Sequence, residues 1–74
     1  MRLTDTQVEI LESLTPKRFT ELHDLASDVD KEPGPTARSV KSLVAKGLAV
    51  ESAKGGSFKR TPAGNAEVKT RMNN

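Results

Sequence analysis

Basic and hydroxyl-bearing side chains recur between residues 34 and 50, and no Asp or Glu interrupts them. Lysine and arginine can hold phosphate oxygens, arginine can also donate two hydrogen bonds to one guanine, and hydroxyls can bond either group. Surface helices usually mix both signs of charge, so this acid-free segment favours contact with nucleic acid over an ordinary solvated surface. The candidate residues of this segment are Thr36, Arg38, Ser39, Lys41, Ser42 and Lys46.

A second cationic stretch follows around two consecutive glycines. Gly55 and Gly56 can adopt positive φ angles and so form a tight hairpin. Their backbone N–H groups, beside lysines, suit a phosphate or minor-groove contact, although the glycines can equally serve the turn alone. Lys17 and Arg18 form a further cationic pair that could add a phosphate contact. The candidates of the second stretch are Lys54, Gly55, Gly56, Ser57, Lys59 and Arg60.

The residue types needed for catalysis are scarce. His23 is the only histidine and cysteine is absent, which leaves no basis for a His-dependent triad, a disulfide or a thiolate metal site. Acidic pairs one helical turn apart, such as Asp24 and Asp28, more often form a solvated helix face than a cation site. We therefore predict that the chain is not an enzyme and has no catalytic residue, metal ligand or cofactor.

The 74 residues are enough for one small domain, covering 1–74, and too few for a second core. The net charge is only +2, but the two parts of the chain differ in sign. Residues 1–32 contain eight acids and four bases, whereas residues 33–74 contain two acids and eight bases. Such a dipolar surface can orient a domain on an anionic polymer.

No apolar run approaches the roughly 18 residues needed to cross a bilayer, and the N-terminus lacks the apolar core of a signal peptide. The absence of cysteine is typical of proteins from a reducing compartment. The chain begins with Met and carries no tag. These observations predict a complete small cytoplasmic protein with no membrane partner.

The elements that must position the candidate residues begin and end at recognisable signals. Thr4 and Gln7 have the spacing of a capping box, so a first helix begins there and is ended by Pro16. Thr20 is the expected N-cap of a second helix, because it precedes a new apolar stripe. Residues 30–34 contain Pro and Gly and are expected to form the turn that follows.

A third helix is expected from Pro35 to about Lys46, with Gly47 ending it. A helical wheel centred on Val40 places the apolar residues on one side and the basic and small residues on the other. The expected core stripe is Ala37, Val40, Leu43 and Val44. The opposite side contains Pro35, Arg38, Ser42 and Ala45, flanked by Ser39, Lys41 and Lys46.

Two short strands are expected next, at residues 48–52 and around Phe58, with Leu48 and Val50 on the half-buried side of the first. Thr61 and a following proline begin a last helix. The predicted fold class is therefore α+β. The order of elements is that of a small winged helix-turn-helix: a three-helix core, a two-stranded β-hairpin wing and a short C-terminal helix.

Four segments resemble the MarR-type winged-helix regulators. Residues 3–14 are similar to the opening helix of that family, and Thr20 with residues 25–26 to its second helix. Residues 43–48 resemble its junction into the wing, and residues 61–64 its Thr-Pro-x-Gly exit. The chain departs from the family pattern at Lys31, Thr36, Ser39 and Arg60. It also lacks counterparts of the long dimerisation helices, so it resembles a minimal domain of the family.

The resemblance and the basic segments together predict sequence-selective binding of double-stranded DNA by a small transcriptional regulator. One alternative is a protein–protein interaction module on a winged-helix scaffold, since residues 1–32 are acidic. Another is a recombination or excision accessory factor that also binds DNA. We expect a weak homodimer, through Val8, Ile10, Leu11 and residues 66–72, or cooperative pairing of two copies on DNA.

Overall fold

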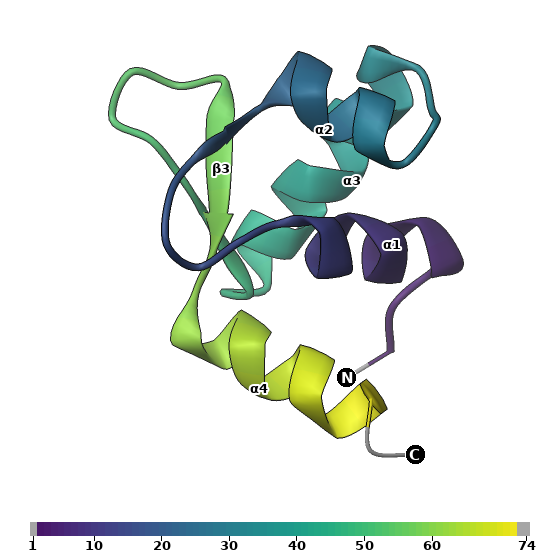
Figure 1. The fold of residues 1–74 in the computed structure, drawn as a ribbon, viewed down its shortest axis with the longest axis vertical. Helices are drawn as coiled ribbons and strands as arrows, with labels where there is room; N and C mark the ends of the chain where they lie inside the picture. Colours follow the sequence, from purple (N-terminus) through teal and green to yellow (C-terminus); the bar gives the residue numbers. More distant parts are fainter. Residues whose placement is uncertain (1, 73–74) are drawn as a thin grey trace.

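A computed structural model describes residues 2–72 of the chain. It contains four helices and one antiparallel sheet of three short strands, which confirms the predicted α+β class (Figure 1). In chain order these elements are α1 (Asp5–Ser13), β1 (Thr20–Glu21), α2 (Leu22–Asp28), α3 (Pro33–Ala45), β2 (Ala49–Glu51), β3 (Ser57–Arg60) and α4 (Pro62–Met72).

The first helix begins and ends as the sequence predicts. The Thr4 hydroxyl accepts a hydrogen bond from Gln7 N at 3.1 Å, and Gln7 Oε1 accepts one from Thr4 N at 3.0 Å. This reciprocal pair satisfies two N–H groups that the helix itself leaves without partners. The helix ends at Ser13, with Leu14 in an extended conformation ahead of Pro16.

The expected N-cap at Thr20 is wrong. Thr20 lies in β1 and pairs with Phe58 of β3, and the N-cap of α2 is Glu21, which makes no side-chain capping bond. The backbone of Leu22 also donates to Gly56 O at 3.0 Å. These bonds to a distant segment hold the chain extended up to Glu21. The sheet therefore has the order β1-β3-β2, where a two-stranded hairpin was predicted.

The third helix begins two residues earlier than predicted. Pro33 occupies its first turn, with Glu32 as the N-cap, so the predicted turn at residues 30–34 is partly helical. The first backbone N–H groups of a helix have no partner within it, so Pro33 and Pro35 forfeit no intrahelical bond there. At the other end Gly47 has a φ of +79°, and its N–H donates to Val44 O at 3.0 Å. This confirms the predicted glycine stop.

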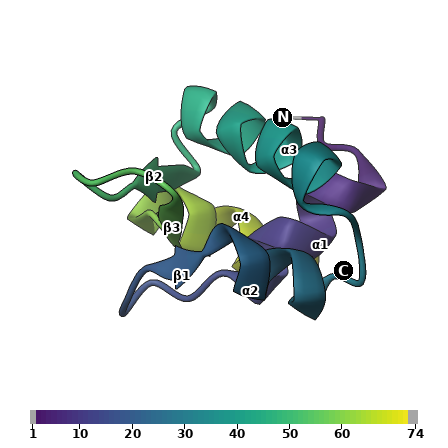
Figure 2. The same ribbon diagram turned by 90° about the horizontal axis from the view of Figure 1, so that it is seen from above.

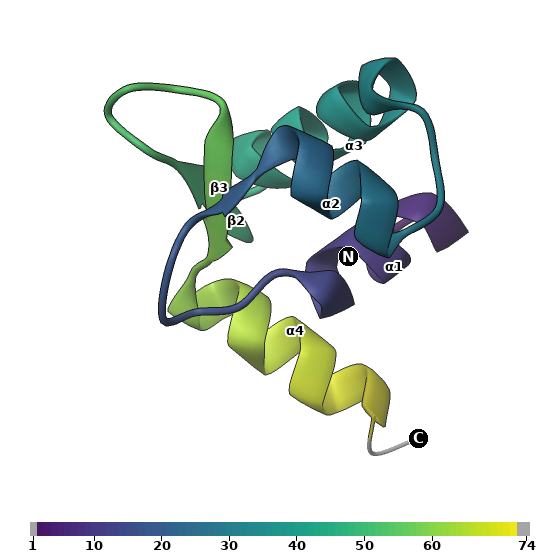
Figure 3. The same ribbon diagram turned by 45° about the horizontal axis from the view of Figure 1, so that its top comes forward.

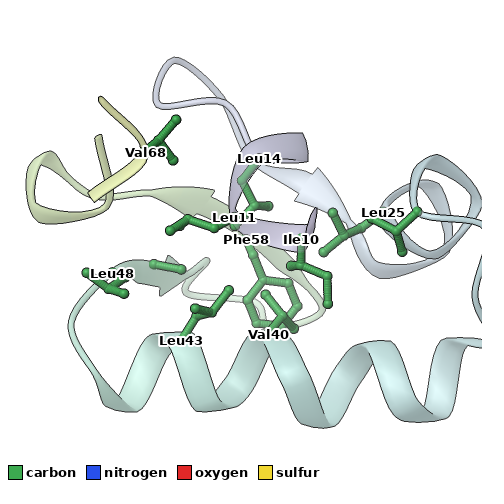
Figure 4. Close-up of a cluster of buried hydrophobic side chains, with 11 residues drawn as sticks. Ile10, Leu11, Leu14, Leu25, Val40, Leu43, Leu48, Phe58 and Val68 are labelled. Carbon is green, nitrogen blue, oxygen red and sulfur yellow. The ribbon is translucent and has the colours of Figure 1, made fainter. Parts of the chain in front are cut away.

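One hydrophobic core joins the helices to the sheet. Val40 and Leu43 of α3 lie against Phe58 of β3 and against Ile10 and Leu11 of α1 (Figure 4). All five side chains are at most 1% exposed. The core thus fixes the rotation of α3 about its own axis, and with it the set of α3 side chains that faces solvent.

Three positions of the predicted core differ. Ala37 and Val44 are only half-buried. Val50 is 38% exposed and its neighbour Ala49 is buried instead. The chain enters β2 one residue after Leu48, so the inward positions of the strand are shifted by one from the predicted alternation.

The helix α3 lies along one side of the molecule, and both α1 and α2 pack against it (Figure 2). The β2–β3 loop extends away from the helical body, and α4 lies at the end remote from that loop (Figure 3). Gly64 allows α4 to approach β2, because a Cβ at this position would collide with Leu48 O and with the Arg60 side chain. Within residues 2–72, no helix is both long enough and apolar enough to span a bilayer.

Candidate nucleic-acid interface

Four of the five exposed residues of the third helix lie in one narrow stripe, and the fifth, Pro35, lies beside it. Thr36, Val40 and Leu43 are buried against the body, so the opposite side of α3 faces outward. Positions separated by four, seven and eleven residues fall within about 60° of one another on a helix. The exposed stripe of α3 defined in this way consists of Gly34, Arg38, Lys41 and Ala45.

The two charged side chains of this stripe are free. Within residues 2–72, neither Arg38 nor Lys41 makes a side-chain hydrogen bond, and the one ion pair joins Arg71 to Glu67 inside α4. Arginine has five N–H donors and lysine three, and within residues 2–72 none of those of Arg38 and Lys41 is used in a side-chain hydrogen bond. Because Gly34 and Ala45 are small, a partner could approach the helix backbone closely one turn before Arg38 and one turn after Lys41.

Ser42 and Lys46 lie beside the stripe, and their side chains already take part in hydrogen bonds within the protein. Ser42 Oγ accepts from Gln7 Nε2 at 3.0 Å and from Lys46 Nζ at 3.2 Å. The hydroxyl is therefore turned toward α1, and Lys46 is exposed but held near it. Ser39 is half-buried on the same flank, one turn before Ser42. These residues can border a contact with phosphate, whereas Ser42 has little capacity left for reading a base.

Thr36 requires a correction. Its relative exposure is 0%, and its hydroxyl donates to Glu32 O at 2.8 Å, one turn earlier in the chain. A threonine can be buried in a helix when its hydroxyl bonds the backbone in this way. Thr36 therefore belongs to the core, and its side chain is unavailable to a ligand on the exposed stripe.

The hairpin loop, residues 52–56, carries one free cation at its tip. Lys54 is exposed, and within residues 2–72 its side chain has no hydrogen-bond partner. Gly55 and Gly56 each have a φ of +83°, as predicted for the turn. However, Gly55 N donates to Ser52 O and Gly56 N donates to Glu51 Oε2, both at 2.9 Å. The glycines thus serve the turn, and the predicted phosphate contact through their N–H groups is not available.

Strand alternation separates the two last cations of this stretch. Successive side chains of a strand point to opposite faces of the sheet. Phe58 points into the core, so Ser57 and Lys59 point outward and Arg60 points inward again. Lys59 Nζ lies 4.8 Å from the centre of the Phe19 ring, which is itself 41% exposed on that outer face. The candidate residues Lys59 and Arg60 therefore lie on opposite faces of the sheet.

Arg60 completes the end of α1. Its NH1 group donates to Leu11 O at 3.2 Å, and its Nε donates to Asn65 Oδ1 at 2.8 Å. Leu11 lies in the last turn of α1, where carbonyl groups lack partners inside the helix and the dipole favours a cation. The helix α1 has no basic residue of its own in that turn. Arg60 therefore has a structural role and leaves the candidate interface.

No protein-family model matches the sequence, and no curated protein sequence is significantly similar to it. Solved structures do match. The multiple antibiotic-resistance repressor MarR from Listeria monocytogenes 4b F2365 aligns with a TM-score of 0.86 at 20% identity, over 97% of this chain and 51% of that one. BpsR from Bordetella bronchiseptica gives 0.86 at 22% identity, over 96% and 53%. A MarR family transcriptional regulator from Silicibacter pomeroyi DSS gives 0.80 at 28% identity, over 97% and 52%.

The chain has a winged-helix fold. This agrees with the resemblance to MarR-type regulators, and the chain spans about half the length of each of these three proteins. In the winged helix, α2 and α3 form the helix-turn-helix, and β2, β3 and the loop 52–56 form the wing. The wing differs from the prediction by the additional strand β1 on its far edge.

Lys17 and Arg18 lie away from the candidate interface. They precede β1, whereas α3 packs against β2 on the opposite edge of the sheet. The predicted pairing surface on the first helix is also wrong in part, because Ile10 and Leu11 are fully buried. Their burial in the winged-helix core leaves them unable to contact a second copy.

Sequence reasoning missed Gly34 as a member of the exposed stripe. It was assigned to the turn before α3, because a Pro-Gly-Pro sequence suggests irregular structure. The preference of proline for the first helical position was the signal that could have identified the earlier start at Pro33. With that start, Gly34 falls one turn before Arg38 on the same side of α3.

Proposed function

We propose that this winged helix binds double-stranded DNA sequence-selectively and acts as a small transcriptional regulator. The observation that carries the proposal is the exposed stripe of α3, with two unpaired cations and no acid from residue 34 to residue 50. A helix of this kind fits the major groove, where base edges can be read. Lys46 and Lys54 would hold flanking phosphates, whereas Lys59 lies over the Phe19 ring on the outer face of the sheet.

The solved neighbours support the same class of function. The Listeria protein is named as a repressor and the Silicibacter protein as a transcriptional regulator. The structural study of BpsR concerns the regulation of its DNA binding by 6-hydroxynicotinic acid. The shared fold extends over almost all of this chain, including α3 and the wing.

The proposal is tested by selecting duplexes from a random pool and measuring the affinity of the protein for them at increasing salt concentrations. Groove binding that neutralises several phosphates weakens steeply as salt rises. We expect Arg38→Ala to weaken binding to the selected duplex by about 1–3 kcal/mol and binding to random duplexes much less. Lys69→Ala is the matched control, because Lys69 is an exposed cation of α4, outside both α3 and the wing. Salt-independent binding, or equal effects of both variants, would contradict the proposal.

Two copies are expected to share one natural site. A single small domain reads a short sequence, which gives low selectivity in a genome. Half-sites about one helical turn apart would let two copies bind the same face of the duplex. Sedimentation with and without the selected duplex measures this directly: we expect a monomer or weakly paired protein alone and two copies per duplex at saturation. A tight dimer in the absence of DNA would contradict weak pairing.

A protein-interaction role is the second candidate. Among the side chains described for residues 2–71, the exposed large apolar ones are Phe19 and Val50, at 41% and 38%. Val50 pairs with Lys59 in the sheet, and Lys59 contacts Phe19, so the three side chains share the outer face. Joint replacement of Phe19 and Val50 by Ser should leave duplex affinity unchanged if DNA is the partner.

A further inference from the structure

The exposed stripe of α3 offers hydrogen-bond donors and no acceptor. Arginine and lysine side chains only donate, and the side chains of Gly34 and Ala45 have no polar atom. The nearest hydroxyl, on Ser42, is already bonded to Gln7 and Lys46. A ligand that satisfies this stripe must therefore present pairs of acceptors.

Only one base presents such a pair in the major groove. Guanine has two acceptors there, N7 and O6, whereas adenine has one acceptor beside a donor and cytosine has a donor. Asn or Gln can bond both the donor and the acceptor of adenine, and Asp or Glu can accept from the donor of cytosine. Residues 34–50 contain none of these four residue types. The stripe is thus suited to guanine and has no means of reading the other donor-bearing bases bidentately.

The spacing of the two cations selects neighbouring base pairs. Arg38 and Lys41 are three residues apart, which corresponds to a rise of about 4.5 Å along the helix. Stacked bases are about 3.4 Å apart. Both side chains are long, and neither is held by a partner within residues 2–72. They can therefore reach acceptors on two adjacent base pairs at the same time.

We propose that the preferred DNA site of this chain contains guanines on two adjacent base pairs, on either strand, one read by Arg38 and the other by Lys41. This inference rests on the proposed function, since it names the sequence that the same surface would read. It adds Lys41 as a second base-reading residue, where phosphate contact alone would give no sequence preference.

The test combines selection from random duplexes with modified bases. Each guanine of the selected pair is replaced in turn by 7-deazaguanine, which lacks the N7 acceptor, or by inosine, which keeps N7 and O6 and lacks only the minor-groove amino group. We expect 7-deazaguanine to weaken binding by about 5- to 150-fold at each position, and inosine to leave it unchanged. Arg38→Ala should abolish the effect of 7-deazaguanine at one position, and Lys41→Ala at its neighbour. Lys69→Ala should abolish neither.

The outcomes separate the inference from the function on which it rests. Salt-dependent binding to selected duplexes that lack an adjacent guanine pair would overturn the inference and leave DNA binding intact. The inference would also fall if 7-deazaguanine acted equally in the wild type and in both variants. The absence of salt-dependent binding to any duplex would overturn the proposed function itself.

Discussion

The helix α3 and the wing carry similar numbers of cations, but the two elements place these side chains differently. On α3, Arg38 and Lys41 have no partner within residues 2–72. On the wing, Lys59 lies over the Phe19 ring and Arg60 is bonded to α1 and α4. Only Lys54 at the loop tip is free in the same sense as the helix cations.

The difference follows from the geometry of the two elements. A helix distributes side chains around its axis, so a whole stripe can face outward while another stripe packs. A strand of a packed sheet must send every second side chain inward. A cationic run in a strand therefore loses half of its charges to the interior or to the far face. Charge counts alone overstate what the wing can offer to DNA.

The largest expected effect comes from removing the packing that fixes the rotation of α3. Leu43→Ala deletes a fully buried side chain and should lower the free energy of unfolding by about 2–5 kcal/mol, which is a large share of the stability of so small a domain. Val44→Ala, at the half-buried neighbouring position, should cost less. Urea denaturation of both variants measures the difference. Equal costs would mean that α3 is rotated, and the assignment of its exposed stripe would fail with it.

Arg60→Met tests whether the inward cation of the wing is structural. Loss of its hydrogen bonds to Leu11 and Asn65 should cost about 1.5–3 kcal/mol, because one partner is charged. Lys59→Met removes a cation–π contact and should cost only about 0.5–1 kcal/mol. Thermal unfolding ranks the two. Duplex affinity of folded Arg60→Met should equal that of the wild type, and a large loss would return Arg60 to the interface.

A smaller effect is expected at the wing tip. Lys54→Ala should weaken binding to all duplexes alike and reduce the slope of log K against log salt by about one unit, because a single phosphate contact is lost. Lys69→Ala again serves as the control on α4. A slope identical to that of the wild type would remove the wing from the DNA contact and leave α3 alone.

The smallest effect is expected from the acid at the base of the wing. Glu51 Oε2 accepts from Gly56 N, and an amide oxygen can do the same. Glu51→Gln should thus keep the loop shape while removing a charge that repels phosphate, and tighten binding by about twofold, as for charges about 8 Å apart in water. Glu51→Ala, which loses the hydrogen bond as well, should not tighten it. Anisotropy titrations at low salt resolve the two, and tighter binding by both would make the hydrogen bond irrelevant.

Local signals in the sequence predicted the local structure well. The capping box at Thr4 and Gln7, the glycine stop at Gly47 and the positive φ angles of Gly55 and Gly56 each depend on residues a few positions apart. The errors depend on residues far apart in the sequence. Thr20 is extended because it pairs with Phe58, thirty-eight positions away in the chain.

The candidate site was predicted only in part, because some of its side chains are oriented by contacts with distant residues. The free cations of α3 could be found from helical periodicity alone. The inward orientation of Arg60 required the side of the sheet on which Phe58 packs. The burial of Thr36 required the start of α3 at Pro33, since only then does its hydroxyl face the carbonyl of Glu32. Threonine and arginine are usually exposed, so the residue types alone predicted that Thr36 and Arg60 face solvent.

The bond from Arg60 to Leu11 joins the beginning of the chain to its last third. A chain that had formed only its first two helices would lack the cation that neutralises the carboxyl end of α1. Opening of the β3–α4 joint would likewise expose that end to water, so amide hydrogens of α1 should exchange in the same opening event as those of β3. We therefore expect the acidic and basic parts of the sequence, although opposite in charge, to unfold together as one cooperative unit.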